Sequence, residues 1–219
     1  MRAKAKLDRI PGGLRFLVAL SIAMLVYCPA IAEDSVGAVV ERMKSTSAVR
    51  IAYRETRYLE LFEKPVETSG MFYGMPPDAL IKEQLSPSRE VMGILQDDYY
   101  YYNPENGLHH SQARNPDDPM TLQLAALQAL ANGNQDLLRE LYRISFVTEP
   151  GHWYMILSDR NESQSLVRIT VSGSAGQPAE RIEIHEADGE RSVYRLEKDA
   201  EGEGVRTSVL LLEAELTGQ

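Results

Sequence analysis

The sequence contains a single cysteine, Cys28, among its 219 residues. This cysteine lies directly after an apolar N-terminal run, so a chain cleaved beyond that run has no thiol at all. Such a chain forms no disulfide and has neither a thiol nucleophile nor a thiolate metal ligand. Histidine is also scarce, and no two of the four histidines have the i, i+4 spacing of a helical zinc site. These absences argue against thiol enzymes and zinc enzymes.

A long apolar segment is missing as well. The N-terminal apolar run covers residues 16–27, which is short for a transmembrane helix of roughly 20 residues. Five basic residues and one acidic residue precede the run, and Ala30-Ile31-Ala32 follows it with small-x-small spacing. This order is typical of a secretory signal peptide and predicts cleavage after Ala32 and a periplasmic protein. The alternative is an uncleaved anchor. The predicted organisation is a signal peptide (1–32) and one domain (33–219).

The chain has no excess of basic residues. It contains 23 Lys and Arg against 32 Asp and Glu, a net charge of −9. Removal of residues 1–32 would make the remainder more acidic, because that segment is basic. An acidic surface does not neutralise backbone phosphates, so nucleic acid is excluded as a partner. The protein is also expected to avoid an anionic membrane surface unless it docks on a basic partner.

Complete catalytic motifs are absent too. The stretch "SGSAG" (172–176) fails the G-x-S-x-G pattern at its first position, and "GEGVRT" (202–207) lacks the third glycine of a dinucleotide loop. "HEADGE" (185–190) lacks the second histidine of H-E-x-x-H. The acidic pairs at 97–98 and 117–118 fit a turn and a helix start. We therefore predict no enzyme activity, no catalytic residue, no metal site and no cofactor.

Helical periodicity occurs near the N-terminus and in the middle of the chain. Residues 34–45 have apolar residues on one face, with Asp34 or Ser35 as the cap. A central region contains two further helices, the first with Pro119 in its first turn and Gly133 at its end. The first central helix is apolar on nearly all sides, so it is expected to be buried or to cover an apolar surface.

The rest of the chain has the period of two that is typical of strands. Short alternating runs separated by Pro, Gly or Asp predict about ten or eleven antiparallel strands, ending with a strand at 204–216. Asp188-Gly189 lies between two such runs and predicts a tight hairpin. The predicted fold is mainly β with some α, an α+β class.

Several of these segments, taken in order, resemble a known family. They are the first long strand around Arg54 and Arg57, "SGMFYGMPPDAL" (69–80), "SPSREVMGILQDDYYYY" (86–102), the Leu/Ala-rich helices and the hairpin "RIEIHEADGERSVYRL" (181–196). Together they resemble the LolA family of periplasmic outer-membrane lipoprotein carriers, nearest to its LolA-like branch. The resemblance implies an incomplete antiparallel β-barrel whose open mouth is covered by a short helical lid.

The resemblance also implies a function. A carrier of this family holds the acyl chains of a lipoprotein or another lipid in an apolar cavity and transfers them toward the outer membrane. An inner-membrane donor complex and an outer-membrane acceptor would be its partners. The alternative is a periplasmic sensor or interaction module of the same fold that binds a protein. The family's lid-latching arginine is replaced here by Pro76, and Arg89 or Arg114 could take its place.

Apolar side chains in the matching segments are the expected ligand-binding residues. The predicted lipid cavity is lined by Leu59, Leu61, Met71, Tyr73, Leu80, Met92, Ile94, Tyr99, Tyr101, Trp153 and Met155. The predicted lid contains Met120, Leu122, Leu124, Leu127, Leu130 and Leu138. A shift of one residue in strand register would exchange each inward residue for its neighbour.

The stretch "DDYYYYNPENGLHH" (97–110) is the most aromatic part of the chain. Successive strand residues face opposite ways, so Tyr99 and Tyr101 are predicted to face the cavity, away from the two tyrosines that alternate with them. Asn106-Gly107 is expected to turn the chain into the next strand. His109 and His110 would then point apart and could not share a metal ion.

Overall fold

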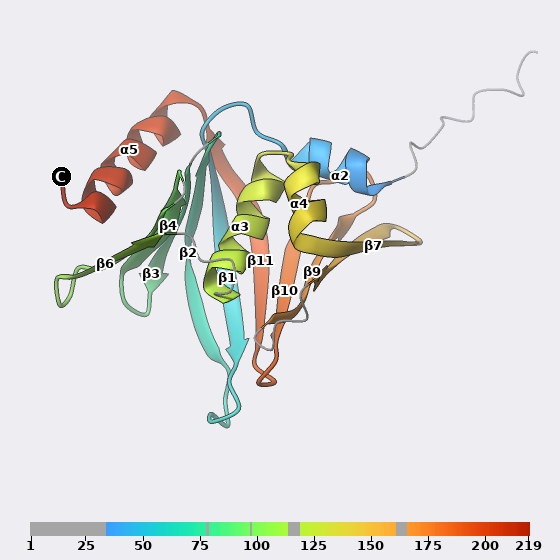
Figure 1. Cartoon of the computed structure of the whole chain (residues 1–219), viewed down its shortest axis with the longest axis horizontal. Helices are drawn as coiled ribbons and strands as arrows, with labels where there is room; N and C mark the ends of the chain where they lie inside the picture. The colour runs from blue at the N-terminus through green and yellow to red at the C-terminus, as the bar shows by residue number, and fades with distance from the viewer. Residues whose placement is uncertain (1–33, 78, 97, 114–118, 161–165) are drawn as a thin grey trace, which may run out of the picture. The chain divides into compact units, whose positions relative to one another are not determined.

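The computed structural model describes residues 34–219 apart from 78, 97, 114–118 and 161–165 (Figure 1). The predicted signal peptide lies outside the described residues. The described part contains one 11-stranded antiparallel sheet. Its strands are β1 (Val49–Tyr58), β2 (Val66–Met75), β3 (Ala79–Ser86), β4 (Glu90–Leu95), β5 (Asp98–Asn103), β6 (Leu108–Ala113), β7 (Tyr142–Glu149), β8 (His152–Asp159), β9 (Leu166–Ser174), β10 (Arg181–Glu186) and β11 (Arg191–Glu201).

The strand order is β6-β5-β4-β3-β2-β1-β11-β10-β9-β8-β7. The sheet is therefore two meanders joined where β1 pairs with β11, for example Tyr53 opposite Leu196 and Glu55 opposite Tyr194. The ends of this order, β6 and β7, do not pair with each other, so the sheet stays open. The predicted α+β fold with an open antiparallel sheet is confirmed, and so is the hairpin at Asp188-Gly189, where Gly189 has φ +91°.

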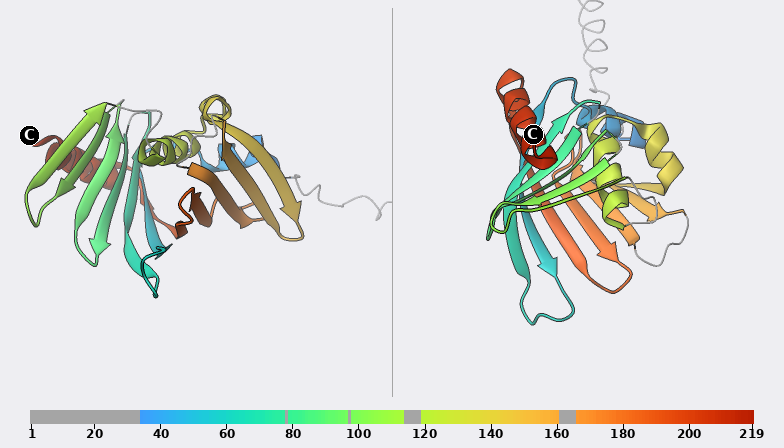
Figure 2. Two further views of the ribbon diagram at one scale, coloured as in Figure 1. Left: turned by 60° about the horizontal axis from the view of Figure 1, so that its bottom comes forward. Right: turned by 60° about the vertical axis from the view of Figure 1, so that its left-hand side comes forward.

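Helices α2 (Val36–Met43), α3 (Pro119–Ala131) and α4 (Gln135–Leu141) lie on one face of the sheet, which we call the inner face (Figure 2). The cap of α2 is Ser35, whose hydroxyl accepts from the Ala38 N–H. Asn134 caps α4 in the same way through the Leu137 N–H. All three helices were expected from the sequence.

The main hydrophobic core lies between this inner face and the three helices. Trp153, Met155 and Leu157 of β8 are completely buried there, together with Leu130 of α3 and Leu138 of α4. Helix α3 is buried on nearly every side, as its apolar sequence predicts. Each buried methylene contributes about 0.8 kcal/mol, so this layer is a principal source of stability.

The C-terminal segment is a helix, and the prediction of a strand at 204–216 was wrong. Helix α5 (Glu203–Thr217) buries Val205, Val209, Leu212 and Leu216. Their spacing of four, three and four residues is the helical period, which the β-branched Val and Thr residues obscured. Gly218 ends the helix with φ +71°, a left-handed conformation that suits glycine.

Helix α5 lies on the opposite side of the sheet from α2–α4, on what we call the outer face (Figure 2). Its buried side chains pack against Tyr73, Ile81 and Val91 of the first meander. Arg89 fixes the end of the helix, because its two terminal nitrogens donate to both carboxylate oxygens of Glu215 at 2.6 and 2.7 Å. Hydrogen bonding to Arg89 holds the pKa of Glu215 below its ordinary value, although burial opposes this.

We expect Glu215→Gln to lower the free energy of unfolding at pH 7 by about 1 kcal/mol, the upper range for a partly exposed pair. A carboxylate with a depressed pKa stabilises the fold at neutral pH, and this contribution is lost as the pH falls through the folded-state pKa. Urea titrations at pH 7 and pH 3 should therefore show a difference only at pH 7. Glu213→Gln is the control, because burial raises the pKa of Glu213 and its charge stabilises nothing. An equal loss at both pH values would contradict the assignment.

Candidate functional site

The inner face contains an apolar cavity near the end of α2. Its volume is about 370 Å³, within the roughly 300–1,000 Å³ of typical ligand pockets. Apolar side chains supply most of the exposed lining, and charged side chains stand at the rim. The apolar lining residues are Met43, Val49, Ile51, Ala131, Pro178, Ala179 and Leu196, and the charged ones are Arg42, Lys44, Glu180, Lys198 and Glu201.

Three aromatic rings lie next to this cavity along the strands. The ring centroids of Tyr53 and Phe72 are 4.9 Å apart, and Tyr194 lies 5.9 Å from the first and 6.0 Å from the second. All three side chains are buried. We call this group the aromatic wall. It lies between the apolar cavity and a second cavity, which is lined by the residues two positions further along β1 and β11.

That second cavity is small and polar, with a volume of about 110 Å³. It lies between the sheet and α3, and we call it the polar cavity. Its lining includes Phe72, Met92, Leu124, Leu127 and Ile184 on the apolar side. The polar lining residues are Glu55, Arg57, Lys82, Gln84, Glu90, Gln123, Glu186, Ser192 and Tyr194.

A buried charged network forms one wall of the polar cavity. Lys82 Nζ donates to Glu55 Oε2 at 2.8 Å and to the Tyr194 hydroxyl at 3.2 Å. The Tyr194 hydroxyl donates to Glu55 Oε1 at 2.8 Å, and the Thr68 hydroxyl donates to Oε2 at 3.0 Å. Glu55 is 3% exposed and Lys82 is 8% exposed. Both charges are therefore removed from water but paired with each other.

The electrostatics of this network follow from its geometry. Burial alone would raise the pKa of Glu55, but the charge of Lys82 and the hydrogen bonds hold that pKa below its ordinary value. Burial, followed by the negative charge of Glu55, raises the pKa of Tyr194. Tyr194 therefore stays protonated and donates. Lys82 Nζ also lies 5.1 and 5.0 Å from the ring centroids of Tyr53 and Tyr194, within cation–π range.

Several residues predicted to line a cavity do face α3. Leu80, Ile94 and Tyr99 form a buried cluster with Leu124 of α3, and Met92 and Tyr101 pack against it. Of these residues, Met92 also lines the polar cavity. Trp153 and Met155 lie on the same face in the main core. The four tyrosines therefore alternate as predicted, with Tyr99 and Tyr101 on the inner face and the other two on the outer face.

Other members of that predicted set lie elsewhere. Met71 and Tyr73 pack on the outer face around α5, because Phe72 is the inward residue of β2. Strand β1 ends at Tyr58, so Leu59 and Leu61 fall in the connection to β2, where Leu61 is 93% exposed. The prediction for Met71 and Tyr73 was displaced by one residue, which exchanged the two faces of β2. The prediction for Leu59 and Leu61 extended β1 beyond its end.

The predicted lid residues of α3 and α4 lie at the inner face. Leu122, Leu124, Leu130 and Leu138 are buried, and Leu127 is partly buried against the same core. The side chain of Met120 lies outside the described residues. Helix α3 and the sheet are also joined by a polar contact, since the Tyr142 hydroxyl on β7 donates to the Leu122 carbonyl at 2.9 Å.

Of the two candidate replacements for the latch arginine, Arg89 has a different role. Arg89 contacts Glu83 and Glu215 and so serves α5 on the outer face. Arg114 lies outside the described residues. At the turn after β2, the side-chain amide of Asn132, just beyond α3, donates to the Pro77 carbonyl at 2.8 Å. This amide joins the end of α3 to the β2–β3 turn, one residue from Pro76.

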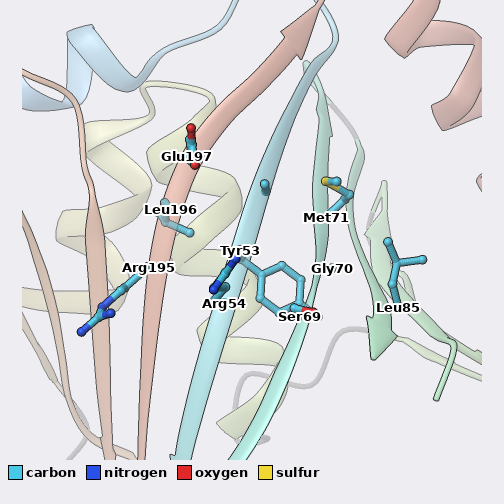
Figure 3. A pocket seen from close by; sticks show the side chains of 10 residues that line it. Tyr53, Arg54, Ser69, Gly70, Met71, Leu85, Arg195, Leu196 and Glu197 are labelled. Carbon is cyan, nitrogen blue, oxygen red and sulfur yellow. The ribbon is translucent and has the colours of Figure 1, made fainter. Parts of the chain in front are cut away.

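A shallow hollow of about 430 Å³ lies on the outer face across β2, β1 and β11 (Figure 3). Arg54 and Arg195 stand opposite each other there on paired strands, with Met71 and Leu85 at one side. Within the described ranges, neither arginine forms an ion pair. The hollow is open and its lining is mixed, so the inner face remains the better candidate for an enclosed site.

Among the residues that the structure describes, no histidine belongs to a cluster of possible metal ligands, whereas three carboxylates do cluster at a turn. The His109 ring stacks on Tyr102 at 4.1 Å on the outer face, while His110 lies within 3.5 Å of Gln112. Carboxylates of Glu186, Asp188 and Glu190 lie within 4.8 Å of one another at the β10–β11 turn. Burial, followed by the charge of Asp188, raises the pKa of Glu186.

Across the described part of the chain, no helix has the length and hydropathy to cross a membrane.

The charged network was not predicted from the sequence. Its signal was present, because Glu55 follows Ile51 and Tyr53 at strand spacing and therefore shares their inward face. Lys82 follows Leu80 in the same way on β3. A charged residue at an inward position is the informative exception in an apolar face.

The sequence matches the model of a known protein family. A family model described as "Outer membrane lipoprotein carrier protein LolA-like" matches residues 28–199. The match spans the whole described sheet to near the end of β11 and stops before α5. No curated protein matches the sequence.

Solved structures with a similar fold share little sequence with this chain. A LolA superfamily protein from Nitrosomonas europaea is 10% identical, with 73% of this chain and 88% of that chain covered and a TM-score of 0.45. A chain of the Clostridioides difficile CwlD amidase–GerS lipoprotein complex is 10% identical, with 85% and 92% covered and a TM-score of 0.36. A chain of the Pseudomonas aeruginosa MucA/MucB complex is 10% identical, with 76% and 56% covered and a TM-score of 0.41. At these values the likenesses say nothing about what this chain binds.

Proposed function

Because the chain belongs to the LolA-like family of outer membrane lipoprotein carrier proteins, we propose that it is a non-enzymatic periplasmic lipid carrier. It would bind acyl chains of a lipoprotein or another lipid at the inner face and transfer them toward the outer membrane. An inner-membrane donor complex and an outer-membrane acceptor would be its partners. The signal peptide would be removed after Ala32.

The observation that carries this proposal is the apolar cavity of about 370 Å³ between the sheet and the helices. An acyl chain entering it would leave water at a gain of about 0.8 kcal/mol for each methylene buried. Met43 suits chains of different lengths, because its side chain is flexible and polarizable. The charged rim would keep the entrance hydrated while the chain is held inside.

Longer chains would require α3 to move. The polar cavity of about 110 Å³ beneath α3 is smaller than the roughly 300–1,000 Å³ of typical ligand pockets. Helix α3 carries apolar side chains on nearly all sides, so it can cover either the sheet or a lipid on it. The lid role of α3 and α4 is therefore part of the proposal.

Filling the apolar cavity should block binding. Leu196→Trp is expected to weaken the binding of a fluorescent fatty-acid probe by at least about tenfold, since about 1.4 kcal/mol of lost contact suffices. The measurement is a fluorescence titration of the purified protein. Leu210→Trp is the matched control, because Leu210 lies half exposed on α5 away from the inner face. If both variants bind as the wild type does, the apolar cavity is not the binding site.

The alternative function is a sensor or interaction module that binds a protein. The open hollow with Arg54 and Arg195 on the outer face could receive an acidic partner, and this is the feature that favours it. If the wild-type protein binds no amphiphile in the same titration, this alternative replaces the carrier.

A further inference from the structure

The polar cavity does not suit an acyl tail. Its lining combines three carboxylates, from Glu55, Glu90 and Glu186, with the cations of Arg57 and Lys82. Burying methylene groups against these side chains would give little hydrophobic gain and would remove charged groups from water without new partners. A cavity for tails alone would be better lined by apolar residues, as the neighbouring apolar cavity is.

Hydrogen-bonding groups with further capacity line this space. An ammonium group has three donors, and Lys82 uses two of them on Glu55 and Tyr194. Arg57 makes two long contacts, of 3.7 Å to Glu55 and of 3.9 Å to Glu190, and neither is within hydrogen-bond distance. In the residues that the structure describes, neither Glu90 nor Glu186 forms an ion pair. The cavity therefore offers both donors and acceptors.

The balance of charge selects the kind of ligand. Three carboxylates against two cations leave the cavity close to neutral, so neither a strongly anionic nor a strongly cationic head is favoured. A neutral group with hydroxyl and ester oxygens can accept from Lys82 and Arg57 and donate to Glu90 and Glu186. Such pairings satisfy buried polar groups that would otherwise oppose binding.

We propose that the polar cavity is a head-group site for a neutral glyceryl or other hydroxyl-bearing head of an amphiphile. The acyl chain would extend past the aromatic wall toward the apolar cavity. Ile51 of the apolar cavity and Glu55 of the polar cavity are four residues apart on β1, or about 13 Å at roughly 3.3 Å per residue. This inference rests on the proposed carrier function and adds the class of its cargo.

The test compares two ligands with the same chain, 1-monolauroylglycerol and laurate, by calorimetry below their micellar concentrations. The wild-type protein should bind monolauroylglycerol about tenfold more tightly, as expected for one or two hydrogen bonds to charged groups. Glu55→Gln combined with Lys82→Met removes both charges together and should abolish this preference while laurate affinity is retained. If the double variant folds poorly, Tyr194→Phe takes its place in the test. It removes one hydroxyl with little change of shape and should reduce the preference.

The matched control removes a partly exposed pair, Arg50 and Asp199, whose atoms lie 2.5 Å apart and which line neither the apolar cavity nor the polar cavity. Arg50→Met with Asp199→Asn should keep the wild-type preference. A wild-type protein that binds laurate as tightly as monolauroylglycerol would overturn the head-group site but not the carrier. The head-group site would also be overturned if the preference for monolauroylglycerol were equal in the wild type, the Glu55 and Lys82 double variant and Tyr194→Phe. Failure of the wild type to bind either ligand would overturn the carrier function itself.

Discussion

Lys82→Met is expected to lower the free energy of unfolding by about 3–5 kcal/mol, because it removes the cation that is hydrogen-bonded to the buried carboxylate of Glu55. Glu55 is 3% exposed and would keep the hydrogen bonds from the hydroxyls of Tyr194 and Thr68 and the longer 3.7 Å contact to Arg57. Urea denaturation at pH 7 measures the change. The loss should shrink as the pH falls, since protonation of Glu55 removes the unpaired charge.

The double variant Lys82→Met with Glu55→Gln separates the charge effect from packing. Removing both partners of a buried pair is often neutral, so this variant should recover most of the lost stability. Arg50→Met is a control, because its partner Asp199 is about one-third exposed and an exposed pair contributes roughly 0–1 kcal/mol. A double variant as unstable as Lys82→Met would show that Lys82 acts through packing.

Fixing α3 to the sheet is expected to abolish lipid binding. Ile94 and Leu124 lie in one buried cluster, so cysteines at both positions are suited to a short bis-methanethiosulfonate crosslinker, whose disulfides a reductant cleaves. The cross-linked protein should show no titration with the fatty-acid probe if the ligand enters by displacing α3. The reduced protein should bind as the wild type does. The protein cleaved after Ala32 has no other thiol, since Cys28 lies in the removed segment.

The matched control joins two strands on the outer face. Ala52 and Met71 are direct neighbours on β1 and β2, and a crosslink between cysteines there leaves α3 free. This protein should bind the probe whether oxidised or reduced. Unchanged binding after the Ile94–Leu124 crosslink would mean that the ligand enters without movement of α3, through the apolar cavity alone.

Much of the fold was predictable, because strand and helix periods are local properties. Period-two runs, Gly and Pro breaks and the Asp188-Gly189 turn located the strands, and the cap at Ser35 located α2. The C-terminal helix was missed because its residues are mostly β-branched or leucine, and a short apolar run fits both states. Its identity depends on burial against the outer face, a tertiary effect.

The site was less predictable, because it depends on which face each strand turns inward. The tyrosines of β5 were assigned to the correct faces, whereas Met71 and Tyr73 were exchanged with Phe72. Parity within one strand is fixed by its register with the next, which no local pattern specifies. The pairing of Glu55, Lys82 and Tyr194 brings together three distant strands and follows only from the order of the sheet.

The central claim is that this protein carries lipid at its inner face. Native mass spectrometry of the protein purified from a bacterial periplasm, followed by organic extraction and identification of the released molecules, tests it most directly. We expect a complex with one lipid or acylated peptide per chain, and the Leu196→Trp variant should be recovered largely free of it. Wild-type protein recovered without lipid, yet in stable complex with a protein partner, would contradict the claim.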